Sequence, residues 1–151
     1  MPRMNSKLAY LRHTAVGCVA TMLLVGMSGC AKEPFPCAPV SGVVTLDGKP
    51  LGMARVIFSP KQVGESAIVG PTSFCLTDDQ GHYELATTTG KPGAMVGSHT
   101  VYICGEVRDE ENPDVILVKE YLPKRYYEGT ELSYDVTSWG TSEANFELSS
   151  K

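Results

Sequence analysis

The sequence predicts an all-β domain built as a small sandwich of two sheets, and three observations lead to this prediction. From Val40 onward, short runs rich in β-branched and aromatic residues alternate with clusters of Gly, Pro, Asp and Lys. No stretch in this part of the chain shows helical periodicity over a useful length. Isolated short hairpins are marginally stable in water, so two sheets are expected to close on each other around one core.

Residues 1–29 are expected to be a secretion signal. They carry Arg3, Lys7 and Arg12 and no acidic residue, and an apolar run follows at residues 15–27. A membrane-spanning helix needs about 20 apolar residues, whereas this run is shorter and ends in small residues. We therefore expect the segment to be cleaved rather than retained.

The end of this segment, residues 24–30, reads Leu-Val-Gly-Met-Ser-Gly-Cys. It resembles the lipobox of bacterial lipoproteins, in which small residues precede a cysteine that is acylated before cleavage. The resemblance implies that Cys30 is lipidated, becomes the mature N-terminus and anchors the protein to a membrane leaflet. Ala31, where lipoproteins retained in an inner membrane often have Asp, favours an outer membrane, on its periplasmic or surface face. The alternative is that Cys30 is an ordinary cysteine after a conventionally cleaved or uncleaved segment.

Residues 30–39 are expected to form an extended tether rather than a strand, because three prolines fix φ and remove backbone donors. Once residues 1–29 are removed, 10 Lys and Arg face 17 Asp and Glu, a net charge of −7. Such an acidic body lacks the clustered basic residues that bind phosphate backbones. Nucleic acid is therefore excluded as an expected partner.

Seven strands are expected in the single domain of residues 40–151. Asp47 and Gly48 are expected to form the turn between the first and second strands, and Asp78 and Gly81 the turn between the third and fourth. Each of these two pairs is expected to be a hairpin, and the whole a sandwich of immunoglobulin-like size. The expected strands are residues 40–46, 53–59, 73–77, 82–86, 97–104, 132–136 and 144–148.

Alternation along the strands predicts which side chains face the core. Four apolar side chains of the third and fourth strands alternate with polar neighbours and are expected to point inward. His82 and His99 are expected on the solvent side. The four side chains expected in the core are Phe74, Leu76, Tyr83 and Leu85.

A long connection, residues 105–130, separates the fifth and sixth strands. It contains an acidic run at residues 109–114 and an apolar patch at residues 115–118. Loops of this length in a compact domain are functional or mobile.

Three segments, in this order, resemble the carboxypeptidase regulatory-like domain: residues 40–51, 77–85 and 96–101. The resemblance implies a transthyretin-like sandwich close to the Cna B-type repeat. Such domains serve as spacers, stability modules or binding modules on exported proteins. The C-terminal part is similar to small bacterial lipoproteins that consist of a tether and one such domain, for which no chemistry is assigned.

No metal site, cofactor or catalytic activity is expected. Asp78 begins a stretch like a calcium loop, but Thr89 stands at the twelfth position, where an EF-hand needs Glu, so a hairpin turn is favoured. His82 and His99, with Tyr126 and Tyr127, do not match the spacing of the iron ligands of intradiol dioxygenases, whose sandwich is related. No Gly-x-Ser-x-Gly elbow is present to activate a serine nucleophile.

Three cysteines remain beyond the anchor, Cys37, Cys75 and Cys104. An exported protein can form disulfides, and at most one bridge is possible among three thiols. Cys75 and Cys104 are a candidate pair because both are expected opposite the apolar faces of their strands. Cys37 is a competing partner, and buried free thiols are the remaining alternative.

The expected function is that of a non-enzymatic, membrane-anchored envelope lipoprotein that displays a structural or protein-interaction module, with an envelope protein as its partner. The alternative is a module that binds glycan or another envelope ligand. That alternative needs an exposed aromatic cluster, because aromatic rings offer flat apolar faces to sugars. The candidate aromatic residues are Tyr102, Tyr126, Tyr127 and Trp139.

Overall fold

The structure is a computed structural model that describes residues 35–62, 69–109 and 111–151. They belong to one compact unit, Pro34–Lys151. The predicted signal peptide, its cleavage site at Cys30 and the first part of the predicted tether lie outside the described residues. No helix in the described ranges has the length and apolar character needed to cross a membrane.

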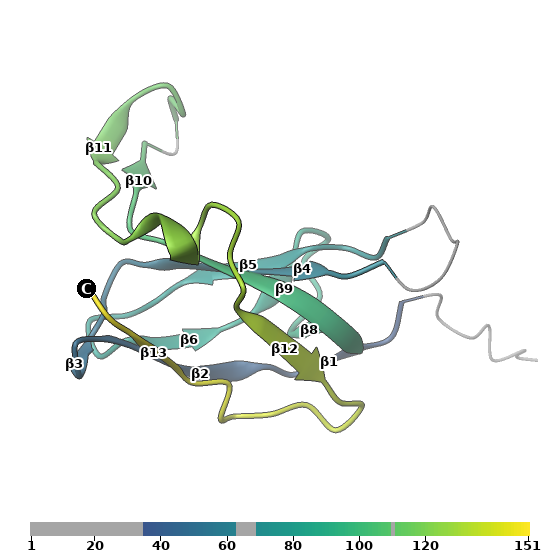
Figure 1. Ribbon diagram of the computed structural model, residues 1–151. Coiled ribbons are helices and arrows are strands. Elements are labelled where there is room, and N and C mark those ends of the chain that lie inside the picture. Colours follow the sequence, from purple (N-terminus) through teal and green to yellow (C-terminus); the bar gives the residue numbers. More distant parts are fainter. Residues whose placement is uncertain (1–34, 63–68, 110) are drawn as a thin grey trace, which may run out of the picture. The chain divides into compact units, whose positions relative to one another are not determined.

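The described residues are all-β, with one short 3-10 helix, η1 (Lys124–Tyr126) (Figure 1). All seven expected strands form, and six short strands accompany them. The expected strands are β2 (Ser41–Leu46), β4 (Arg55–Pro60), β5 (Ser73–Leu76), β6 (His82–Glu84), β9 (Gly97–Cys104), β12 (Ser133–Val136) and β13 (Phe146–Leu148). The additional ones are β1 (Cys37–Ala38), β3 (Lys49–Pro50), β7 (Ala86–Thr87), β8 (Ala94–Met95), β10 (Val107–Arg108) and β11 (Ile116–Val118).

Two sheets make up the body of the domain. The larger is antiparallel and has the order β12-β9-β4-β5-β7. The other has the order β13-β2-β3, with β6 also paired to β2, and β13 runs parallel to β2. Strands β1 and β8 pair with each other, as do β10 and β11.

The inner faces of the two sheets share one apolar core, which gives the domain its sandwich-like character. Phe58 of the larger sheet meets Phe146 of the smaller one, with 6.1 Å between the ring centroids in an edge-to-face arrangement. Alternate residues along β2, β4 and β9 are buried, as the two-residue period requires. The larger sheet contributes Val56, Phe58, Val101 and Ile103 to this core, and the smaller contributes Val44, Tyr83, Phe146 and Leu148.

The turn at Asp47 and Gly48 is present, but the hairpin expected around it is wrong. Both residues have positive φ, 50° and 76°, and the turn joins β2 to the two-residue β3 rather than to β4. The chain then crosses to the larger sheet. The buried hydroxyl of Thr77 holds this crossing, since it donates to the Leu51 carbonyl at 2.6 Å and accepts from the Ala54 amide at 3.0 Å.

The second expected hairpin is also wrong, although its turn is present. Asp78 accepts hydrogen bonds from the Gln80 and His82 amides at 2.8 and 2.9 Å, and Gly81 has φ 77°. The turn carries the chain from β5 in one sheet to β6 in the other. A turn motif specifies the local reversal, whereas the sheet that the next strand joins depends on contacts distant in sequence.

Strand β5 presents its small side chains to the core. Ser73 is buried and lies opposite Phe58, whereas Phe74 and Leu76 are 47% and 42% exposed. The inward orientation expected for Phe74 and Leu76 is therefore wrong, while that of Tyr83 and Leu85 is confirmed. Bulky Phe58 and Val56 already fill the core opposite β5, so small residues fit there.

The tether expected at residues 30–39 is wrong at its C-terminal end. Cys37 and Ala38 form β1 and pair with Met95 and Ala94 of β8. Ala38 is buried, so the domain begins at this pair rather than at Val40. Pro36 and Pro39 flank Cys37 and Ala38, but they do not prevent these two residues from pairing with β8.

Candidate functional site

The long connection after β9 folds into a projecting hairpin, which we call the arm and define as residues 105–121. Its strands β10 and β11 pair with each other only, within the part of the chain that the structure describes. Figure 1 shows the arm extending beyond the larger sheet. Four consecutive apolar side chains on it have exposed fractions between 43% and 59%: Val115, Ile116, Leu117 and Val118.

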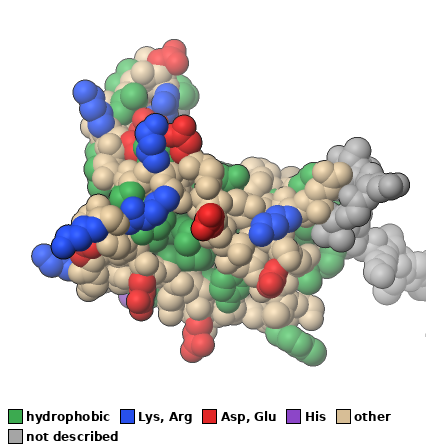
Figure 2. Space-filling view, viewed as in Figure 1, with side chains coloured by type: hydrophobic (Ala, Val, Ile, Leu, Met, Phe, Trp, Pro, Cys, Tyr) green, Lys and Arg blue, Asp and Glu red, His purple; other side chains and the backbone are tan. Residues whose placement is uncertain are grey.

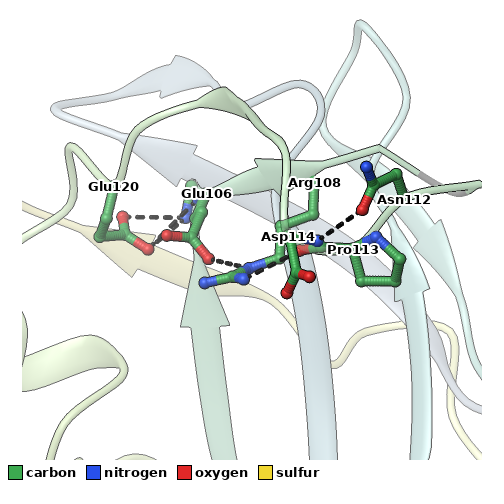
Figure 3. Close-up of polar contacts among 7 residues, drawn as sticks. Glu106, Arg108, Asn112, Pro113, Asp114 and Glu120 are labelled. Carbon is green, nitrogen blue, oxygen red and sulfur yellow. Dashed lines mark hydrogen bonds and ion pairs between the residues drawn. The ribbon is translucent and has the colours of Figure 1, made fainter.

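Glu120 fixes the base of the arm. Its carboxylate accepts hydrogen bonds from the Gly105 and Glu106 amides at 3.0 and 3.2 Å on one side (Figure 3). On the other side it accepts from the Tyr121 and Leu122 amides at 3.0 and 2.8 Å. One carboxylate therefore ties together the chain segments that enter and leave the arm.

A second polar group stiffens the arm along its length. The Arg108 guanidinium pairs with the Glu106 carboxylate at 2.6 Å and donates to the Pro113 carbonyl at 3.0 Å (Figure 3). At the tip, the Asp109 carboxylate accepts from the Glu111 and Asn112 amides at 3.0 and 2.8 Å. These contacts satisfy the polar groups of the arm internally and leave its apolar side chains facing outward.

A groove of about 440 Å³ separates the arm from the outer face of the larger sheet. Its apolar walls come from Met53 and Leu76 on the sheet side and from Leu117 on the arm. Arg55 and Arg108 are among the charged residues that border it. Figure 2 shows hydrophobic, basic and acidic side chains together on the surface of the arm. An apolar groove with a charged rim has the composition of a protein-binding surface.

Strand β11 has one open edge in the part of the chain that the structure describes. Its pairing with β10 occupies one edge, and no other described strand pairs with it. An unpaired edge offers backbone amides and carbonyls in the pattern that an added strand requires. The exposed side chains of β11 would give such a partner apolar contacts as well.

The candidate disulfide does not form. Cys75 and Cys104 are both free thiols in the structure, and the strand register explains why. Cys75 lies opposite Val56 on the inner face, whereas Cys104 lies opposite Arg55 on the outer face. The two are also two strands apart, roughly 10 Å, which exceeds the Cα separation of about 7 Å that a disulfide tolerates.

His82 and His99 lie on strands of different sheets, β6 and β9. His82 is exposed beside Asp78, with 3.6 Å between Nδ1 and the carboxylate. His99 is fully buried, so its expected position on the solvent side is wrong. Residues two apart on a strand share a face, and His99 follows the inward parity of Val101. Within the described ranges, no three His, Cys, Asp or Glu side chains converge as metal ligands.

The candidate aromatic residues do not form one surface. Tyr126, the last residue of η1, is buried, while Tyr102 and Tyr127 are half-buried. Trp139 is 92% exposed on the loop between β12 and β13. The apolar run at residues 115–118 is the sequence feature that indicated an exposed surface. The role of Glu120 could not be predicted, because nothing in the sequence shows which amides its carboxylate contacts.

No family model, curated protein or solved structure matches the chain.

Proposed function

We propose that this chain is an exported, lipid-anchored envelope protein without catalytic activity, which uses its arm to bind another protein. Its fold is proposed to be the transthyretin-like sandwich of carboxypeptidase regulatory-like domains. In support, the three segments that carry this resemblance contribute β2 with its turn, the Asp78 turn with β6, and the first half of β9. The anchor is proposed to be the acylated Cys30.

The observation that carries the proposal is the position of the arm relative to the start of the domain. Strand β9 begins at Gly97, two residues after Met95, which pairs with Cys37 of β1. It ends at Cys104, where the arm begins. An eight-residue strand is roughly 25 Å long. The apolar arm is therefore displayed about one strand length from the end at which the chain enters.

The chemistry of the arm defines the partner. Four exposed apolar side chains and an open strand edge favour a protein that supplies an extended segment with apolar side chains. A partner of this kind gains main-chain hydrogen bonds from β11 and buries Leu117, the most exposed of the four.

Two measurements test the two halves of the proposal separately. The first is the intact mass of the protein purified from the membranes of its own cells, compared with a Cys30→Ala variant. A mass that begins at acylated Cys30, and a variant that is neither acylated nor cut before position 30, would support the anchor. An unlipidated chain that keeps residues 1–29, or is cut elsewhere, would overturn it.

The second measurement places a photo-crosslinking residue at position 117 and, in a separate variant, at position 69. Val69 is a matched control because it is apolar and 46% exposed, while it lies near the chain entry. We expect a discrete cross-linked protein from position 117 only, lost in Leu117→Asp and retained in Val69→Asp. Equal products from both positions, or none from position 117, would remove the binding role from the arm.

A further inference from the structure

Trp139 is an unusual residue on the surface of this domain. Its exposed fraction is 92%, the highest among the large hydrophobic side chains of the described residues. Tryptophan carries the largest side chain and is highly buried on average, so full exposure leaves a large apolar area in contact with water. It is also the single tryptophan of the chain.

The loop that carries Trp139 is fixed to the beginning of the domain. The Gly140 amide donates to the Thr137 carbonyl at 3.1 Å and closes a tight turn with Trp139 inside it. The Thr141 amide then donates to the Pro39 carbonyl at 2.9 Å. Gly140 packs so closely on Pro39 that any side chain there would clash with its carbonyl. Trp139 is therefore held at a set position next to the entering chain.

The entering chain is short. Six residue steps separate Cys30 from Pro36, whose carbonyl accepts from the Val96 amide within the domain. Fully extended, this stretch spans about 20 Å at most. Other apolar residues gather at the same end, since Phe35 and Met95 both lie against Gly70, next to the exposed Val69. An anchor at Cys30 would hold this apolar end close to the membrane surface.

The chemistry of the loop distinguishes a lipid surface from a charged one. Asp135 and Glu143 flank it and are exposed, and no Lys or Arg occurs in residues 126–150. Residues 126–150 therefore supply no cation of their own for anionic headgroups. An indole, in contrast, partitions to the boundary between headgroups and acyl chains because it has an apolar body and a polar N–H.

We propose that Trp139 docks into the lipid interface beside the anchor, so that the domain stands on the membrane by this end and directs its arm outward. This inference rests on the proposed acylation of Cys30. The two contacts act together: the anchor raises the local concentration of Trp139 at the bilayer, and the indole then limits the tilting of the domain. Neutral lipid is sufficient for this docking.

The emission of Trp139 tests the proposal directly, because no other tryptophan contributes. The lipidated protein is reconstituted into vesicles of zwitterionic phosphatidylcholine, and its emission is compared with that of an unlipidated chain that begins at Ala31, in buffer. We expect a blue shift, protection from acrylamide, and quenching by phosphatidylcholine brominated on its acyl chains. The matched control is Trp139→Phe/Leu117→Trp, which moves the single tryptophan to the arm and is expected to show none of these changes.

Each outcome is decisive. A protein that floats with the vesicles while its Trp139 emission stays unchanged would overturn the docking and leave the anchor intact. A chain from its own membranes that carries no acyl group would overturn the anchor and the docking with it. If soluble envelope glycan shifts the emission of the chain that begins at Ala31 without vesicles, Trp139 belongs to a sugar site and the membrane assignment is wrong.

Discussion

The imidazole of His99 lies against the ring of Phe58, with 5.7 Å between the ring centroids. Its Nδ1 lies 3.0 Å from the Gly97 carbonyl, and its Nε2 has no hydrogen-bond partner in the described part of the chain. Burial lowers the pKa of His99 below its usual 6.5, while the Gly97 carbonyl and the Asp135 carboxylate oppose this shift. The core therefore favours the neutral ring.

This burial predicts a pH-dependent stability. Because the pKa of His99 is lower in the folded protein than in the unfolded chain, the unfolded chain binds the proton first as pH falls. The free energy of unfolding is expected to be highest above pH 6.5 and to fall below it, by at most about 1.4 kcal/mol per pH unit, until the folded pKa is passed. Urea denaturation between about pH 8 and about pH 5 measures this.

Two histidine variants separate His99 from the rest of the chain. His99→Leu is expected to abolish the slope, whereas the exposed His82→Gln is expected to retain it. The carboxylates of Asp47 and Asp78 affect the pH dependence of stability only in stronger acid. Hydrogen bonds from Ser150 and from the His82 amide, respectively, hold their pKa values below 3.8. An unchanged slope in His99→Leu would contradict the assignment.

The thiols of the larger sheet are expected to be slow to react and not to bridge. Burial raises the pKa of Cys75 to about 11, and burial and Glu120 raise the pKa of Cys104. At about pH 8, alkylation of Cys75 in the folded protein should be about two orders of magnitude slower than in urea. Residue-resolved mass spectrometry measures the rates. A Cys75–Cys104 peptide in a non-reducing digest would show that the strand register is wrong.

The sequence predicted every main strand because each carries β-branched or aromatic residues between turn residues, and these signals are local. It did not predict pairing. Strand β4 pairs with β9, whose partner residues lie 39 to 49 positions away, and no local pattern distinguishes this from a hairpin with β2. The same limit explains the outward Phe74: alternation identifies two faces, but the face that meets the core is chosen by what packs opposite, in this case Phe58.

In the candidate site, too, local features were predictable from the sequence and long-range contacts were not. The run at residues 115–118 was visible as an apolar patch in a long connection, because its composition is unusual for a loop. The sequence did not predict that a hairpin presents this run. The hairpin depends on the Glu120 carboxylate, which accepts hydrogen bonds from four amides on the two sides of the arm base. Trp139 was visible as an aromatic residue, whereas the position of its loop depends on the hydrogen bond from the Thr141 amide to the Pro39 carbonyl, more than 100 residues away in sequence.

Two glycines allow backbone strain and steric clash to be measured apart. Gly81 and Gly90 have nearly the same φ, 77° and 82°. A Cβ on Gly81 would clash with the Val44 carbonyl, whereas one on Gly90 would meet nothing within 4 Å. Gly90→Ala is expected to cost about 1 kcal/mol from left-handed strain alone. Gly81→Ala should cost about 1–3 kcal/mol more, since the crowding adds to the strain. If urea denaturation shows equal losses of stability in the two variants, the structure of the Asp78 turn is wrong.

The last prediction concerns the base of the arm. Removal of the Glu120 carboxylate leaves the Gly105, Glu106 and Leu122 amides without their acceptor, while the sandwich core is untouched. Hydrogen bonds to a charged group contribute about 1.5–3 kcal/mol, so Glu120→Ala should speed local amide exchange at these positions by about tenfold or more. Amides of β9 in the core should keep their protection, because the arm opens without global unfolding.

Glu147→Ala is the matched control for this variant, because it removes an exposed carboxylate from β13, which lies in the smaller sheet. It is expected to leave exchange in the arm unchanged. Glu120→Ala should also weaken the cross-link from position 117, since a loosened arm loses the ordering that makes binding favourable. If exchange rises in the arm while the cross-link is unaffected, Glu120 orders the arm without contributing to its binding. If neither changes, the carboxylate does not hold the arm at all.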